Sequence, residues 1–264
     1  MKKIVIAGCL ILSVSLVPAQ PKEGKVTYVR TSQMMAHINI NGEENVVPQS
    51  RTDKFELTFG NNQSLWKQAE QEIQDNDNVN SGGMQIHMIV AGSDDVLFND
   101  FATAKKVELR VLFDKKFIVD DSIRPMKWKM GEETKTILNH LCQNASTVRY
   151  SKRTTMNIDN GKMERKEIDD TANITAWFTT DIPVSAGPAE YQGQLPGLIL
   201  AMDVNNGRQV FKAIDIAEKA DLSVIKEPQG KKRYTPDEFK KESVKMMDEM
   251  QRNNGGGNRQ IRIN

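Results

Sequence analysis

Apolar and polar residues alternate at every second position in several short segments of the chain, which is the period of a β-strand with one buried face. In 54–59 the apolar positions are Phe55, Leu57 and Phe59, and the residues between them are polar or charged. Other short segments are rich in β-branched and aromatic residues and are bounded by turn residues, which also predicts strands. The predicted strands cover residues 25–31, 54–59, 84–90, 96–101, 106–113, 116–119, 125–130, 134–138 and 141–150.

Asn-Gly pairs mark turns between strands, because asparagine and glycine accept the positive φ angles of a type I′ hairpin turn. Asn160-Gly161 lies between the charge-rich extended segments 153–158 and 162–168. Asn206-Gly207 and Asn41-Gly42 mark two further turns. Short, closely spaced strands joined by tight turns predict an antiparallel sheet.

The segment 61–80 has a different pattern. Its apolar residues are spaced so that they would share one side of a short helix, and a polar run over 75–78 follows them. We therefore predict a short helix or an ordered loop here, with the polar run as a surface insertion. The apolar residues concerned are Leu65, Trp66, Ala69 and Ile73.

A helix start is encoded near the C-terminal end. Thr235 can cap a helix, Pro236 suits its first position, and the acids that follow complement the helix dipole. We predict a helix over 235–252 and a flexible Gly/Asn-rich tail over 253–264.

The segment 176–200 holds the densest group of prolines and glycines in the chain. Pro196 presets the φ angle of a turn, and Gly197 is expected to adopt the left-handed conformation that a type II turn requires. The apolar segment 198–204 follows directly, so this turn is expected to fix the register at which a core strand begins. A rigid loop presented to a partner is the alternative interpretation.

The N-terminal residues have the pattern of a secretory signal peptide: Lys2 and Lys3, an apolar run over 4–17 and a small-residue cleavage site ending at Ala19. The apolar run is shorter than the roughly 20 residues that a membrane-spanning helix needs. Cleavage after Ala19 removes two lysines and no acid, which changes the formal net charge from +1 to −1. A nearly neutral chain lacks the field that attracts nucleic acid. We expect an exported β-rich domain over 20–234, without a membrane span.

Cys142 remains as a lone cysteine in an oxidising compartment, because Cys9 leaves with the signal peptide. We expect it to be a small buried apolar residue. His140 lies two residues before it, so in a strand both side chains point to one face. The two are weak candidates for a soft zinc or copper site, with His37, His87 and several methionines as further ligands.

An enzymatic function has little support in the sequence. A thiol nucleophile at Cys142 would pair with His140, but no orienting acid or oxyanion donor accompanies them. No serine has a Gly-x-Ser-x-Gly context. We therefore predict no catalytic residues and no cofactor, and a hydrolase ranks third among the functional alternatives.

Three parts of this sequence, the segment 177–200, an upstream block and the C-terminal ending, carry a family resemblance. They resemble the GLPGLI family, exported proteins of Bacteroidota. The upstream block includes 116–120, Trp128, 134–137 and Cys142, and the usual family ending resembles 231–239. One departure is Gln194, which stands where the family name has its first glycine, with Gly193 just before it. The signature positions, which we interpret as structural, are Trp177, Pro183, Gly187, Pro188, Leu195, Pro196, Gly197, Leu198 and Ile199.

The resemblance implies no activity, because the family has no established catalytic residues. By analogy with lipoprotein carriers, the expected fold is one large curved antiparallel sheet, like a half-barrel, with a C-terminal helix. The expected function is a non-catalytic binding or carrier protein of the periplasm, the outer membrane or the cell exterior. Its ligand would be apolar or peptide-like and lie on the concave face, or its partner would be an envelope protein. A soft-metal-binding protein is the alternative.

Overall fold

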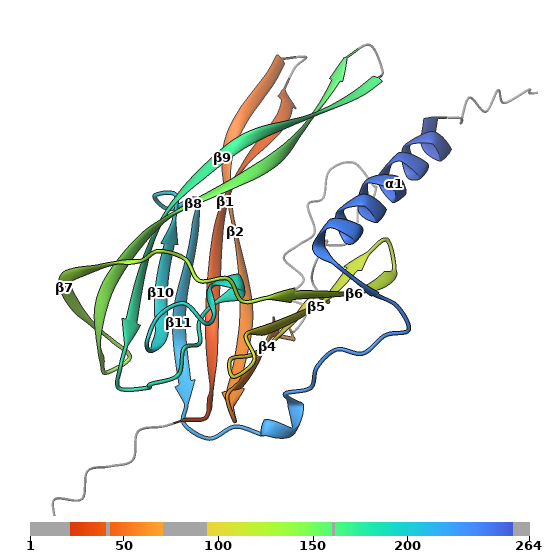
Figure 1. Ribbon diagram of the computed structural model, residues 1–264. Helices are drawn as coiled ribbons and strands as arrows, with labels where there is room; N and C mark the ends of the chain where they lie inside the picture. Colours follow the sequence, from red (N-terminus) through yellow and green to blue (C-terminus); the bar gives the residue numbers. More distant parts are fainter. Residues whose placement is uncertain (1–21, 41–42, 71–93, 160–161, 256–264) are drawn as a thin grey trace, which may run out of the picture.

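The computed structural model describes residues 22–40, 43–70, 94–159 and 162–255 and forms one sheet of twelve strands with a C-terminal helix (Figure 1). The order across the sheet is β12-β6-β5-β4-β3-β2-β1-β11-β10-β9-β8-β7, and every pairing is antiparallel except that of β12 with β6. The mainly β fold with a C-terminal helix is confirmed. The strands are β1 (Gly24–Ile40), β2 (Glu43–Gly60), β3 (Gln63–Gln68), β4 (Val96–Asp100), β5 (Lys105–Leu112), β6 (Lys115–Ser122), β7 (Lys129–Ile137), β8 (His140–Asp159), β9 (Lys162–Thr179), β10 (Leu198–Val204), β11 (Gln209–Ala217) and β12 (Arg233–Tyr234).

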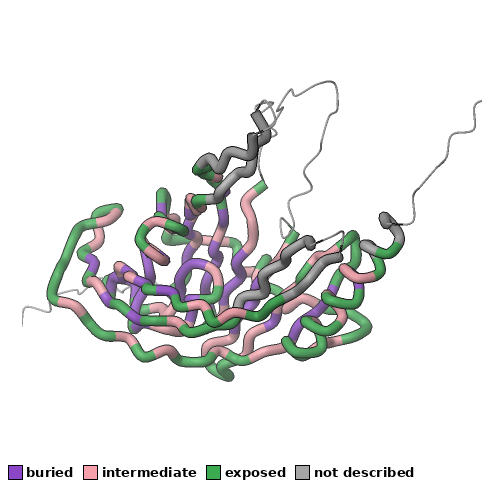
Figure 2. Tube along the Cα trace, turned by 90° about the horizontal axis from the view of Figure 1, so that it is seen from above, coloured by how far each residue is buried: buried purple, intermediate pink, exposed green. Residues whose placement is uncertain are grey.

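The sheet curves around the segment 180–197, which connects β9 to β10 and which we call the plug. Six steps of about 4.8 Å separate β3 from β8 along the sheet, or about 29 Å. Yet two plug residues only two positions apart reach both strands: Gln192 bonds Ser64 of β3, and Glu190 bonds Arg149 of β8. Figure 2 shows the buried positions gathered in the middle of this curve. The strands therefore fold around the plug.

The main core lies between the plug and the inner face of the sheet. The alternation in 54–59 is confirmed, since Phe55, Leu57 and Phe59 are all buried in this core. The Phe55 ring stacks on Trp66 of β3, with 4.9 Å between ring centres. Tyr28 of β1 packs 5.4 Å from the same indole, and its hydroxyl donates a 2.6 Å hydrogen bond to the Ile199 carbonyl. This aromatic cluster thus links β1, β2 and β3 to the start of β10.

The prediction of a helix or loop in 61–80 is wrong for its first part, which is strand β3. Trp66 faces the main core, whereas Leu65 belongs to a second buried cluster with Phe98, Val107 and Ile118. Both faces of this strand are covered, so its apolar residues are adjacent instead of alternating. Ile73 and the polar run over 75–78 lie outside the described residues.

The C-terminal part of the chain covers both faces of β6. Residues 218–232, which we call the strap and which include the short helix η3 (Leu222–Val224), lie against the second cluster through Ile225. Helix α1 (Pro236–Gly255) packs against the opposite face, where Met246 is buried with Phe117 and Val119. Between the strap and α1, β12 adds to β6 at the sheet edge.

Helix α1 begins as predicted. The Thr235 hydroxyl accepts from the Glu238 backbone N–H at 3.3 Å, and the Glu238 carboxylate accepts from the Thr235 N–H at 2.8 Å, which forms a capping box. The helix runs to Gly255, so it includes 253–255 of the predicted tail. Lys240 of α1 forms an ion pair with Glu167 of β9, which ties the helix to the opposite side of the sheet.

The remaining strand predictions are mostly confirmed, with one exception. The predicted strand 125–130 is wrong over 125–128, because β7 begins only at Lys129 and the Met126 N–H bonds the Gln194 side chain instead of a strand. Among the predictions outside the described residues are the signal peptide, the strand over 84–90 and the turns at Asn41-Gly42 and Asn160-Gly161. No helix within the described part is long and apolar enough to cross a bilayer.

Candidate functional site

The predicted signature residues meet at the plug and at the two strands that flank it. Trp177 lies in β9, Leu198 and Ile199 begin β10, and the prolines and glycines lie between them. The apolar plug residues enter the main core and are buried there: Ile182, Ala186, Tyr191 and Leu195. The signature therefore builds the structure that fills the inner face of the sheet.

Gly197 does not adopt the left-handed conformation that the type II turn prediction required; the plug glycine with positive φ is Gly193, at +73°. A Cβ atom on Gly197 would lie 2.1 Å from the Thr179 carbonyl oxygen and 2.8 Å from its carbon. Glycine is needed here because the ends of β9 and β10 approach each other too closely for a side chain.

Gln194, the departure from the family name, fixes the chain between β6 and β7. Its carboxamide oxygen accepts from the Met126 N–H at 2.9 Å, and its nitrogen donates to the Arg124 carbonyl at 3.1 Å. A glycine could make neither bond. The side chain supplies backbone partners to a segment that has no strand neighbour of its own.

Polar side chains hold the plug on both sides of the curve. Arg149 donates to the Glu190 carboxylate at 2.7 Å and to the Tyr191 hydroxyl at 3.0 Å. Burial raises the pKa of the Tyr191 phenol, so it remains a neutral partner. On the other side, the buried Ser64 hydroxyl donates to the Gln192 carboxamide oxygen at 2.6 Å. Removing either partner of this buried bond leaves the other unsatisfied.

Cys142 is fully buried in the main core, and its thiol donates to the His140 carbonyl with 3.6 Å between sulfur and oxygen. Burial raises the pKa of the thiol to about 11, and the nearby Asp181 carboxylate acts in the same direction. The His140 imidazole is partly exposed and contacts Asp181 at 3.2 Å. This thiol is protonated at neutral pH, which is unfavourable for nucleophilic attack or metal binding.

The residues of the metal hypothesis are not brought together in the part of the chain that the structure describes, where no three His, Cys, Asp or Glu side chains converge. His37 lies in β1, far along the chain from His140 in β8, and His87 lies outside the described residues. The soft-metal function stays a prediction.

A charged cluster on the inner face was missed by the sequence reasoning. Asp53 is 2% exposed and accepts from two arginines, Arg30 at 2.8 Å and Arg51 at 2.7 Å. The Arg30 guanidinium also lies 4.5 Å from the centre of the Phe55 ring. Arg51 and Asp53 lie on the same face of β2 as the buried Phe55, Leu57 and Phe59. Charged residues that continue this alternating apolar pattern are the sequence signal from which the cluster could be predicted.

The edge of the sheet at β7 and β8 is only partly covered. β7 pairs with β8 from His140 to Ser146, whereas β8 continues to Asp159. Over 148–159 its only described neighbour is β9. Two apolar residues are exposed at the start of this segment, Val148 at 43% and Tyr150 at 80%. In Figure 1 the far ends of β8 and β9 project beyond the neighbouring strands.

The comparisons with known proteins give two distant structural matches and one family-model match over part of the chain. A search of curated proteins found no match. One similar solved structure is "Structure of PNGF-II in P21 space group", with 15% sequence identity and a TM-score of 0.49; the match covers 85% of this chain and 33% of that chain. A second is "Structure of PNGF-II in C2 space group", with 19% sequence identity and a TM-score of 0.44; the match covers 84% of this chain and 32% of that chain. The chain thus spans about a third of their length. The model of a family described as "Protein of unknown function (Porph_ging)" matches residues 128–201, which run from the start of β7 through the plug into β10.

Proposed function

We propose that this chain is an exported cell-envelope protein of the GLPGLI type that binds an extended polypeptide segment without catalysing a reaction. The segment would add as a strand along the free edge of β8, over 148–159. The observation that carries the proposal is the length of this edge beyond the end of β7. The family match over 128–201 supports the family part of the proposal, because it covers the plug and the exposed edge together.

The free edge of β8 has the chemistry that strand addition needs. The backbone N–H and C=O groups of alternate residues point away from β9, so they are available to a new strand. The segment is about 40 Å long at the rise of an antiparallel strand. Val148 and Tyr150 are exposed there, and β-branched and aromatic side chains form favourable cross-strand pairs.

The two outermost strands of the sheet are protected. At one end, β12 pairs with Ile118 and Val119 of β6, and α1 packs beside it. At the other end, β7 carries several charged residues and has a register irregularity between Met130 and Thr134. Charges and irregularities of this kind prevent edge-to-edge pairing in natural sheets. Segments 33–40 of β1, 43–54 of β2 and 162–173 of β9 also have few or no pairs on one side, and among the described side chains the β8 edge differs from them by its exposed Val148 and Tyr150.

The concave face is less suited to the ligand than the sequence suggested. The plug lies on that face and bonds both β3 and β8 through Gln192 and Glu190. A ligand in the same place would have to displace four buried apolar plug residues from the core. The free edge requires no such displacement.

The proposal is tested by selecting short linear peptides against the purified chain from a displayed random library. We then measure the affinity of a selected peptide by fluorescence anisotropy. Binding should protect the backbone amides of 148–152 from hydrogen exchange. Tyr150→Ala should weaken binding about three- to fivefold, the size of one aromatic cross-strand pair. The matched control is Ile214→Ala, since Ile214 is an exposed apolar residue of β11, which has a strand on each side.

A pair of proline variants sharpens the test. Of the neighbours Tyr150 and Ser151, one directs its N–H toward β9 and the other toward the free edge. Proline at the residue whose N–H points toward the free edge should keep the fold and abolish peptide binding, because it removes no bond to β9. Peptides that bind equally well to both proline variants and to Tyr150→Ala, without protecting 148–152, would refute strand addition here. Selection of no peptide at all would refute the polypeptide ligand.

A further inference from the structure

A groove of about 380 Å³ lies between the strap and the face of β5 and β6 that carries the second cluster. Leu109 and Ile118 form its apolar floor, and the Tyr234 ring lies at one end. Its polar lining includes three lysines and no acidic residue: Lys116, Lys231 and Lys232. The volume is at the lower end of the range for small-molecule sites.

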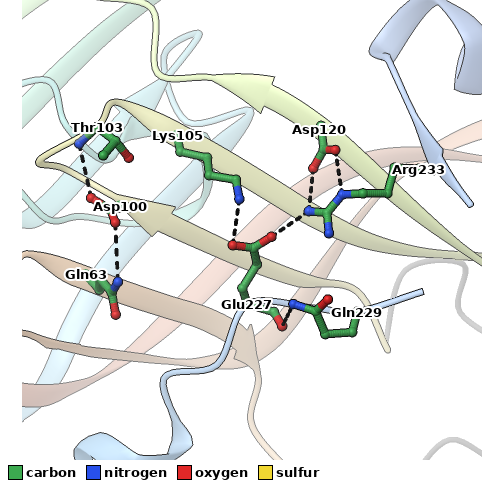
Figure 3. A network of polar contacts seen from close by, with 8 residues as sticks. All are labelled: Gln63, Asp100, Thr103, Lys105, Asp120, Glu227, Gln229 and Arg233. Atoms are coloured by element: carbon green, nitrogen blue, oxygen red, sulfur yellow. Dashed lines mark hydrogen bonds and ion pairs between the residues drawn. The ribbon is translucent and has the colours of Figure 1, made fainter. Parts of the chain in front are cut away.

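The acidic residues near the groove are already paired with other cations, so the three groove lysines do not neutralise them. The Arg233 guanidinium forms two bonds with Asp120, at 2.6 and 2.7 Å, and a third with Glu227 at 2.6 Å (Figure 3). Lys105 contacts the other oxygen of Glu227 at 2.7 Å. Two cations and two anions thus neutralise each other, and these hydrogen bonds lower the pKa of both carboxyl groups.

The groove lysines form no ion pair with any residue in the described ranges. The Lys232 ammonium lies 4.3 Å from the centre of the Tyr234 ring, which holds it beside the groove. Lys116 extends from β6 on the same face as Ile118, two residues further on. Three positive charges therefore surround an apolar floor, and the complementary molecule has a negative head and an apolar tail.

We infer that this groove binds a single-chain anionic amphiphile of the fatty-acid type, independently of the proposed polypeptide site. The carboxylate contacts the ammonium groups of Lys116, Lys231 and Lys232, and the hydrocarbon chain lies on Leu109 beside Gly230, which covers Ile118. The groove is too small for a folded partner, and an inorganic anion would leave its apolar floor uncovered.

The strap holds this groove in shape through backbone packing. A Cβ atom on Gly230 would lie 2.6 Å from the Cγ1 atom of Ile118, so the strap backbone rests directly on the floor of the groove. Glu227 accepts from Lys105 of β5 three residues before this contact, and Arg233 donates to Asp120 of β6 three residues after it, so the strap is fixed on either side. The site is thus formed before a ligand arrives, which lowers the entropic cost of binding.

The test uses isothermal titration of the purified chain with dodecanoate below its critical micelle concentration, at low ionic strength. Three comparison probes separate the parts of the ligand: butyrate has the head alone, a dodecyl maltoside has the tail alone, and phosphatidylglycerol vesicles present anionic heads on a membrane. We expect dodecanoate to bind and the other three to bind at least tenfold more weakly. Added salt should weaken the dodecanoate complex, because the lysines are exposed.

The triple variant Lys116→Gln/Lys231→Gln/Lys232→Gln should bind dodecanoate about tenfold more weakly, from three contacts between exposed charges. The control Lys54→Gln/Lys129→Gln/Lys212→Gln removes the same charge from β2, β7 and β11 and should bind like the parent chain. Methyl NMR signals of Leu109 and Ile118 should shift on titration.

Three results would overturn the inference. The first is equal dodecanoate affinity in both triple variants, which would place the site elsewhere. The second is equal binding of the maltoside, which would remove the role of charge. The third is binding to vesicles without binding to monomeric dodecanoate, which would indicate a membrane-surface contact. Failure of dodecanoate binding would leave the peptide experiment unaffected, because the two surfaces share no residue.

Discussion

Replacing Gly197 with alanine should destabilise the protein through a clash with backbone, not through an unfavourable φ angle. The new Cβ atom would lie 2.1 Å from the Thr179 oxygen, whereas ordinary contacts are longer than about 3.4 Å. Because Leu198 pairs with Thr179 in the sheet, β9 and β10 must separate by roughly 1 Å where they meet. Overpacking of this kind costs about 2–3 kcal/mol, or about 5–10 °C in melting temperature for a chain of this size.

Gly207 differs from Gly197, because glycine is needed there for its positive φ angle and not for lack of space. Its φ is +88°, and a Cβ atom there would meet only the Gln33 Nε2 at 3.7 Å. Asparagine tolerates the left-handed region better than alanine does, so Gly207→Asn should be more stable than Gly207→Ala. At Gly197, asparagine should be no better than alanine, since it also carries a Cβ atom.

Urea unfolding followed by tryptophan fluorescence gives the change in unfolding free energy for all four variants, and unchanged m-values would show that the comparison is valid. The reasoning fails if Gly197→Ala lies within about 0.5 kcal/mol of the parent chain. It also fails if asparagine rescues position 197, because φ would then be the requirement there.

Three further predictions concern buried and charged groups. Cys142 should resist alkylation in the folded chain and react after unfolding in guanidinium. The pKa of the Cys142 thiol is raised from 9.0 to about 11, so the unfolded chain loses this proton at lower pH than the folded chain does. The free energy of unfolding should therefore fall as pH rises from 9.0 to about 11, and Cys142→Ala should remove this pH dependence. Ser64→Ala should cost about 1–3 kcal/mol by leaving the Gln192 carboxamide unsatisfied. Gln192→Met in the same background should recover part of that loss, and a double-mutant cycle without coupling would contradict it. Hydrogen bonds from Arg233 lower the pKa of the Asp120 carboxyl group. Their contribution to folding stability is therefore present above about pH 4 and is lost as pH falls through the lowered pKa of Asp120. The protection factors of the α1 amides, which compare exchange with the intrinsic rate at the same pH, should fall over that range, and Asp120→Asn should show low protection factors at every pH.

The parts of the fold that the sequence predicts correctly depend on local or periodic signals. The inward phase of Phe55, Leu57 and Phe59 matches the buried face of β2, because one face of that strand lies on the core. The turn at Asn206-Gly207 joins β10 and β11 as predicted, although the positive φ angles begin one residue earlier, at Asn205. The helix start at Thr235 needs only four consecutive residues and is also correct.

The errors arise where distant segments decide the conformation. The spacing of the apolar residues in 61–80 predicts a helix or loop, whereas Leu65 and Trp66 are neighbours in β3 that are buried on opposite faces, Leu65 in the cluster that Ile225 of the strap packs against. The sequence predicts a turn glycine at Gly197, whereas the need for glycine comes from the close approach of Thr179, eighteen positions away. The inward charges of Arg30 and Asp53 satisfy each other across two strands, and that pairing depends on register.

The contacts of the plug indicate where a ligand can bind. Its side chains bond β3 through Gln192, β8 through Glu190 and the chain before β7 through Gln194. Its backbone also bonds the sheet, as the Ile199 N–H donates to the Ala186 carbonyl at 3.0 Å. Moving the plug would break all of these contacts and expose its apolar residues, at a cost well above the few kcal/mol that separate the states of a typical switch. The plug therefore acts as a fixed core element, and binding is expected at the surfaces it leaves free: the edge of β8 and the groove beneath the strap.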